Sequence, residues 1–116
     1  MKDWISYLEK YRCDRVLLDI HIKEIDSSVN LSDRERLLKA ATVLEQSVKE
    51  AETKLDHYIS EDADPREVLR LADEKLFLSY RYICGMTMIE TAYAMCVSKD
   101  TVYRIRRRVL SRPFPG

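Results

Sequence analysis

Basic side chains gather near the carboxyl end of this 116-residue chain. Residues 1–80 hold 13 Lys and Arg against 18 Asp and Glu, whereas residues 81–116 hold 7 against 2, although the whole chain has no net charge. A guanidinium group binds phosphate by charge and can donate two parallel hydrogen bonds to a guanine edge. The uneven charge therefore predicts a polyanion-binding end.

Other residue types that could do chemistry are not grouped in this way. Cys13, Cys84 and Cys96 lie far apart, without the spacing of zinc ligands, and we expect them to be buried free thiols of a cytoplasmic protein. His21 and His57 have no neighbouring nucleophile motif, and the sequence has no Gly-rich phosphate loop. We therefore expect no enzyme, no cofactor and no bound metal.

The basic segment predicts two short helices joined by a tight turn. Thr87 and Glu90 form a capping box that begins a helix over 88–95, with Ile89, Ala92 and Met95 on its buried side. Ser98 caps a second helix, and Cys96 and Val97 form the turn before it, in which Cys96 takes the position usually held by Gly.

The second of these helices has two distinct faces. At about 100° per residue, Val102, Ile105 and Val109 point inward, and Asp100, Tyr103, Arg104 and Arg107 point outward. We expect Arg104 and Arg107 to read guanine edges and Asp100 to accept from a cytosine amine or to orient an arginine. The remaining candidate contacts, mostly to phosphate, are Ser98, Lys99, Tyr103, Arg108 and Arg112. Arg106 lies nearer the inward flank, where a carboxylate is its expected partner.

Long helices with heptad spacing precede this segment. Apolar residues of 3–26 recur at Trp4, Leu8, Tyr11, Leu18, Ile22 and Ile25. A second seam runs through Leu37, Ala41, Leu44, Val48, Ala51, Leu55 and Tyr58, after a capping box at Ser32 and Glu35. A short loop between such helices favours an antiparallel hairpin, but pairing with a second subunit fits the same pattern.

A third helix connects the two parts. Asp64 caps it, Pro65 takes its first position, and Gly85 suits the left-handed residue just past its end. Its apolar face is predicted from Val68, Leu69, Ala72, Leu76, Tyr80 and Ile83. The tail, 112–116, contains Pro113 and Pro115 and is expected to be a loose or extended end.

These elements predict an all-α fold, in which a long coiled-coil-like helical hairpin is followed by a C-terminal helix-turn-helix. Residues 1–62 would form the hairpin, a scaffold or oligomerisation unit, and residues 63–116 the DNA-binding domain.

The stretch ETAYAMCVSKDTVYRIRRRVL resembles the helix-turn-helix of region 4 of bacterial sigma factors. Glu90, Ala92, Val97, Ser98, Thr101 and Val102 match that pattern, and Thr91 and Cys96 depart from it. The layout also resembles small phage transcriptional regulators of the RinA and ArpU type. The resemblance implies DNA binding through the last helix and activation of phage late genes.

The leading expectation is thus a sequence-specific DNA-binding transcriptional regulator, encoded by a phage or prophage. Its expected partners are double-stranded DNA, a second copy of the chain in a dimer, and RNA polymerase, but no membrane. A terminase small subunit that marks phage DNA for packaging is one alternative, and assembly into a ring of many subunits would support it. A helical protein-interaction module is another, and it would gain if the acidic half covered the basic face.

Overall fold

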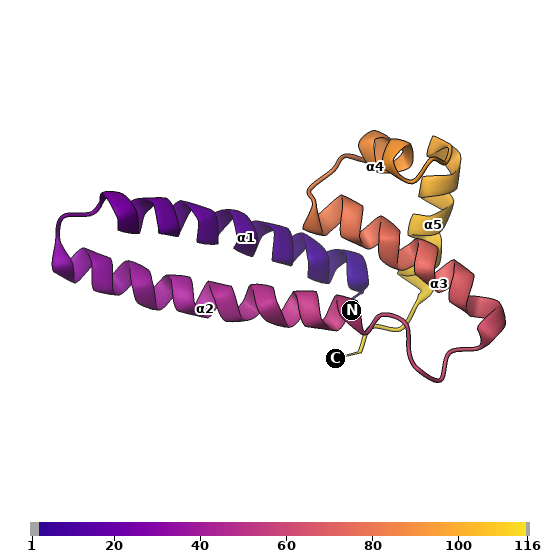
Figure 1. The fold of residues 1–116 in the computed structure, drawn as a ribbon, viewed down its shortest axis with the longest axis horizontal. Helices are drawn as coiled ribbons and strands as arrows, with labels where there is room; N and C mark the ends of the chain where they lie inside the picture. The colour runs from indigo at the N-terminus through magenta and orange to yellow at the C-terminus, as the bar shows by residue number, and fades with distance from the viewer. Residues whose placement is uncertain (1–2, 116) are drawn as a thin grey trace.

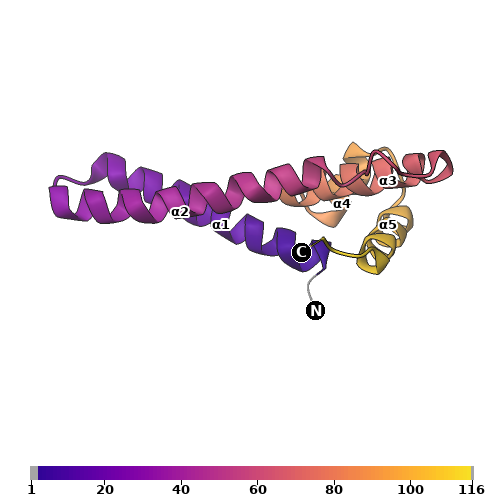
Figure 2. The ribbon, with the colours of Figure 1, turned by 90° about the horizontal axis from the view of Figure 1, so that it is seen from below.

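The computed structural model describes residues 3–115, and in that range it is built from helices without any strand (Figure 1). The helices are α1 (Trp4–Ser27), α2 (Leu31–Asp56), α3 (Pro65–Leu78), the π-helical segment η1 (Ser79–Ile83), α4 (Met88–Ala94) and α5 (Lys99–Ser111). The all-α prediction is confirmed. The molecule is elongated, 56 × 30 × 23 Å, because α1 and α2 project far beyond the other helices (Figures 1 and 2).

α1 and α2 pack along each other as an antiparallel pair, as the heptad spacing predicts (Figure 1). The seam buries Leu8, Tyr11, Leu18 and Ile25 of α1 and Ala41, Val48, Ala51 and Leu55 of α2. Polar bonds beside the seam fix the register, since the Tyr11 hydroxyl donates to Glu52 (2.9 Å) and the Ser47 hydroxyl donates to Asp14 (2.9 Å). Burial of the long apolar stripes against each other is the main stabilisation of this hairpin.

The start of α2 differs from the prediction. Asn30 is the N-cap, and its side chain accepts from the amides of Ser32 (2.9 Å) and Asp33 (3.4 Å). Ser32 therefore lies inside the helix and forms no capping box with Glu35. The physical reason is that an Asn side chain satisfies the free amides of a first turn as well as Ser does, and Asn30 comes first in the chain.

The face of α3 that is buried also differs from the prediction. Val68, Leu69 and Leu76 are exposed, and the buried side consists of Glu74, Phe77 and Leu78. The spacing of apolar residues does not predict this buried side, because its centre is the charged Glu74. Its hydrogen-bond partners, Tyr58 and Arg112, come from distant segments. The helical run continues through η1 to Ile83, and Gly85, shortly after it, has the left-handed φ that the sequence predicts, 74°.

The tail, which was expected to be loose or extended, is extended and is packed against the hairpin. The Phe114 ring centroid lies 5.1 Å from that of Trp4 and 4.8 Å from that of Tyr7. Tyr58 packs on Trp4 from another side, at 5.1 Å. This aromatic cluster (Trp4, Tyr7, Tyr58 and Phe114) joins the last residues to the base of the hairpin.

The cysteines were expected to be buried, and this was wrong. Cys13, Cys84 and Cys96 are free thiols, and all three are exposed.

No helix of residues 3–115 combines the length and the apolar character needed to cross a membrane.

Candidate nucleic-acid interface

α4 begins at a complete capping box, as predicted. The Thr87 hydroxyl accepts from the Glu90 amide (3.2 Å), and the Glu90 carboxylate accepts from the Thr87 amide (3.0 Å). The hydrogen bond from the Thr87 amide, followed by the contribution of the Thr87 side chain, lowers the pKa of the Glu90 carboxyl. The predicted cap of α5 is also present, with the Ser98 hydroxyl accepting from the Thr101 amide (3.2 Å). Both helix starts are thus fixed by bonds that span three residues.

The turn between α4 and α5 has the hydrogen bonds of a Schellman motif. The Val97 amide donates to the Ala92 carbonyl (3.0 Å), and the Cys96 amide donates to the Tyr93 carbonyl (3.1 Å). Cys96 has a φ of 58°, the left-handed conformation that this motif requires and that Gly adopts most easily. The turn geometry is therefore maintained although Gly is missing.

A compact apolar contact holds α4 and α5 together. Val102, Ile105 and Val109 are buried, as the helical wheel predicts, and Ala92 is buried on the α4 side. The other buried residue of α4 is Thr91, whereas Ile89, expected inside, is exposed. The Thr91 hydroxyl donates to the Thr87 carbonyl (2.8 Å), so this side chain fills the space of a Val without an unsatisfied polar group.

The outer face of α5 brings six of the predicted site residues together. All six are exposed, and they are Ser98, Lys99, Asp100, Tyr103, Arg104 and Arg107. Within residues 3–115, neither Lys99 nor Arg104 nor Arg107 forms an ion pair. Lys99 lies 5.9 Å from the Tyr103 ring centroid. We call these six residues the α5 outer face; its positive charges are free to meet an anion.

Arg108 and Arg112, the other two predicted site residues, lie elsewhere. Arg112 donates from Nε and Nη2 to the two carboxylate oxygens of Glu74, both at 2.9 Å, and from Nη2 to Glu67 at 3.2 Å. Arg108 Nε lies 3.4 Å from Glu74. Arg106, for which a carboxylate partner was expected, forms no ion pair among the described residues.

Glu74 is fully buried and is the centre of this second group, which sequence reasoning missed. Tyr58 also donates to it, at 2.7 Å. Burial alone raises the pKa of a carboxyl, but the hydrogen bonds from Arg112 and Tyr58, with the charges of Arg112 and Arg108, outweigh it and hold the pKa of Glu74 below its usual value. Burial and the bond to Glu74 raise the pKa of Tyr58, and the bonds to Glu74 raise that of Arg112. We call Glu74, Tyr58, Arg108 and Arg112 the Glu74 cluster.

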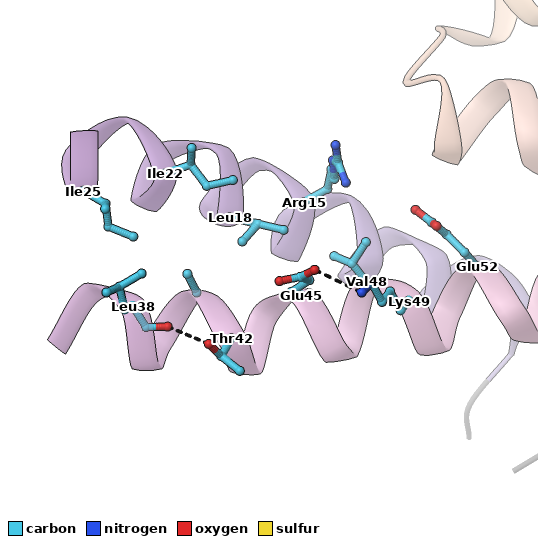
Figure 3. A pocket seen from close by; sticks show the side chains of 11 residues that line it. Arg15, Leu18, Ile22, Ile25, Leu38, Thr42, Glu45, Val48, Lys49 and Glu52 are labelled. Atoms are coloured by element: carbon cyan, nitrogen blue, oxygen red, sulfur yellow. Dashed lines mark hydrogen bonds and ion pairs between the residues drawn. The ribbon is translucent and has the colours of Figure 1, made fainter. Parts of the chain in front are cut away.

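An open groove lies between α1 and α2, along residues 15–25 of α1 and 38–52 of α2 (Figure 3). Leu18, Ile22, Ile25 and Leu38 form its apolar wall, and charged groups line its edge. Among these, Lys49 pairs with Glu45 at 3.1 Å in the same chain. The described residues hold no group of three or more His, Cys, Asp or Glu side chains placed to bind a metal. The α5 outer face therefore remains the candidate site.

Comparison of the chain with protein-family models, with curated proteins and with solved structures found no match.

Proposed function

We propose that this chain is a sequence-specific DNA-binding transcriptional regulator, in which α4 and α5 act as a helix-turn-helix and α5 enters the major groove. The observation that carries the proposal is the α5 outer face, whose cations are exposed and form no ion pair with any described residue, on a helix with a fully buried inner face. In proteins of this class, polar residues at the start of the second helix contact base edges.

Each residue of the outer face has a role in the proposal. Arg104 and Arg107 read guanine, where a bidentate pair discriminates by about 1–3 kcal/mol. Lys99 and Tyr103 contact phosphate, as does the Ser98 hydroxyl, and Asp100 accepts from a cytosine amine or orients Arg104. Arg108 and Arg112 hold α5 in place through Glu74 instead, because their guanidinium groups already face a carboxylate.

The arrangement favours this proposal over a protein-interaction module. The module would gain support if the acidic amino-terminal half covered the basic face, whereas the side chains of Lys99, Arg104 and Arg107 are exposed. Origin in a phage or prophage rests on the resemblance to RinA and ArpU regulators alone. The projecting hairpin offers a surface for RNA polymerase, and a second copy of the chain would double the number of base pairs read.

The test is a binding assay on genomic and phage DNA fragments at several salt concentrations. The native chain is compared with Arg104→Ala/Arg107→Ala and with a control, Arg34→Ala/Arg36→Ala, which removes the same charge from the exposed start of α2. We expect the first variant to lose its preference among fragments and the control to keep it. Failure of the native chain to bind any fragment at low salt would refute the proposal. A ring of many subunits would favour the packaging protein.

A further inference from the structure

An apolar stripe on α3 has no partner among residues 3–115. Leu69 is 79% exposed and Leu76 is 42% exposed, and Val68 and Ala72 are exposed as well. At 100° per residue these side chains share one face with Pro65, on the side of the helix opposite the buried Glu74. We call Pro65, Val68, Leu69, Ala72 and Leu76 the α3 stripe. A stripe of this kind on a well-capped helix is typical of a surface that packs on another helix.

Two unpaired charges of opposite sign lie along one edge of the α3 stripe. Arg66 and Asp73 are both exposed, and neither forms an ion pair with any other described residue. They are seven positions apart, which is about 10 Å along a helix and too far for them to pair with each other. Both lie on the same flank, within about 20° of each other around the helix.

We propose that the α3 stripe binds the α3 stripe of a second copy of this chain, with the two helices antiparallel. A twofold axis keeps each flank opposite the same flank of the partner, so Arg66 of each chain meets Asp73 of the other and both pairs form at once. Near the axis, Ala72 leaves room for the Leu69 side chain of the second copy. This charge complementarity favours a second copy over an unrelated partner. The inference names the partner surface of the proposed regulator and rests on that function for its role.

The contact is small. Three to four turns of one helix cover less than the roughly 800 Å² per partner of a standard interface, so we expect association in the micromolar range. Binding of both copies to one DNA molecule would raise their effective concentration and tighten the pair.

Sedimentation of the full chain without DNA, at about 1 to 200 μM, tests the proposal. We expect the native chain to form a dimer, and Leu69→Lys to weaken the dimer by about tenfold or more, because a charge is placed on the apolar contact. Leu69 is largely exposed in the single chain, so the variant should keep its fold, which circular dichroism and the thermal midpoint verify. The control is Val43→Lys, a similar change at a 67% exposed position of α2, and it should dimerise like the native chain.

Charge reversal gives a second readout that does not depend on apolar packing. Arg66→Asp alone and Asp73→Arg alone each place like charges opposite each other and should weaken the dimer several-fold. An equimolar mixture of the two variants restores both opposite-charge pairs and should associate as the native chain does.

Four results would overturn the inference: a native chain that stays monomeric, a native assembly larger than a dimer, a Leu69→Lys variant that still dimerises normally, or a mixture as weak as its components. Because the sedimentation experiment contains no DNA, its result does not depend on whether the chain binds DNA. A dimer that binds no DNA would refute only the function, and a monomer that reads DNA would refute only the α3 contact.

Discussion

Arg112 donates two parallel hydrogen bonds to Glu74, 38 positions earlier in the chain, and both are 2.9 Å long. Tyr58, from the segment after α2, donates to the same carboxylate. One buried carboxylate thus links the base of the hairpin, α3 and the end of α5. The orientation of α5 on the body of the protein depends on this group, although it lies away from the α5 outer face.

Replacing Glu74 by Gln should lower the free energy of unfolding by about 2–3 kcal/mol. The change removes the charge that compensates Arg108 and Arg112, and the cost is below that of a fully buried pair because both arginines are partly exposed. Urea denaturation measures the loss. The control Glu67→Gln removes a more exposed partner of Arg112 and should cost less than about 1 kcal/mol. Equal losses in the two variants would contradict a central role for Glu74.

The same carboxylate makes stability depend on pH in acid. The pKa of Glu74 is lower in the folded protein than in the unfolded chain, where a Glu titrates near about 4.3. Its contribution is therefore complete above that value and is lost as the pH falls through the lowered folded pKa. The difference in unfolding free energy between the native chain and Glu74→Gln should shrink as the pH falls below about 4. A difference that stays constant from pH 7 to pH 2 would contradict the expected linkage.

Replacing Cys96 by Gly should stabilise the protein by about 0.5–1 kcal/mol. A non-Gly residue in the left-handed region costs about 1–2 kcal/mol, part of which the greater freedom of Gly in the unfolded chain offsets. Cys13→Gly is the matched control, because Cys13 is an exposed cysteine inside α1, where Gly should destabilise by about 0.5 kcal/mol. Thermal unfolding of both variants should show shifts of opposite sign, and shifts of the same sign would contradict the argument.

Removing the Phe114 ring should destabilise the fold by about 1–2 kcal/mol, since half-buried aromatic contacts with Trp4 and Tyr7 are lost in Phe114→Ala. Pro115→Ala, at the exposed neighbouring position, should change stability by less than about 0.5 kcal/mol. Chemical denaturation compares the two. If Phe114→Ala left the free energy of unfolding unchanged, the tail would be loose, and its packing on Trp4 and Tyr7 would be contradicted.

The salt dependence of DNA binding should distinguish Lys99 from Arg112. A phosphate contact removed in Lys99→Ala reduces the slope of log K against log salt by about 1. Arg112→Ala should leave that slope unchanged while lowering thermal stability, because its side chain is held by Glu74 and Glu67. A reduced slope in Arg112→Ala would place this arginine at the phosphate backbone after all.

Most features set by neighbouring residues could be predicted from the sequence, although the N-cap of α2, at Asn30 and not at Ser32, is an exception. The caps at Thr87 and Ser98, the left-handed turn at Cys96 and the inward face of α5 depend on residues within about four positions. The sequence also favoured the pairing of the two long helices, because two heptad patterns joined by a short loop predict an antiparallel hairpin, although pairing with a second subunit fitted the same pattern.

Features set by distant residues could not be predicted. From the sequence alone, Glu74 is expected on the surface of α3, because its partners Tyr58 and Arg112 are distant in the chain. The apolar pattern of α3 predicts that the opposite face is buried. Phe114 lies between Pro113 and Pro115, outside any helical pattern, so no nearby residue indicates its contact with Trp4. The likeness of α4 and α5 to a DNA-reading motif remains an interpretation that the binding assay must decide.

The aromatic cluster has a consequence for rearranging the gene. Because Phe114 rests against Trp4, residues near the two ends of the described range, 3–115, lie close together. A short Gly and Ser linker should join them, and the exposed tip between α1 and α2, at Val29, offers new ends. A circular permutant opened there should fold with the same helices. Its new ends would lie at the tip of the hairpin, which allows a reporter to be attached far from α5.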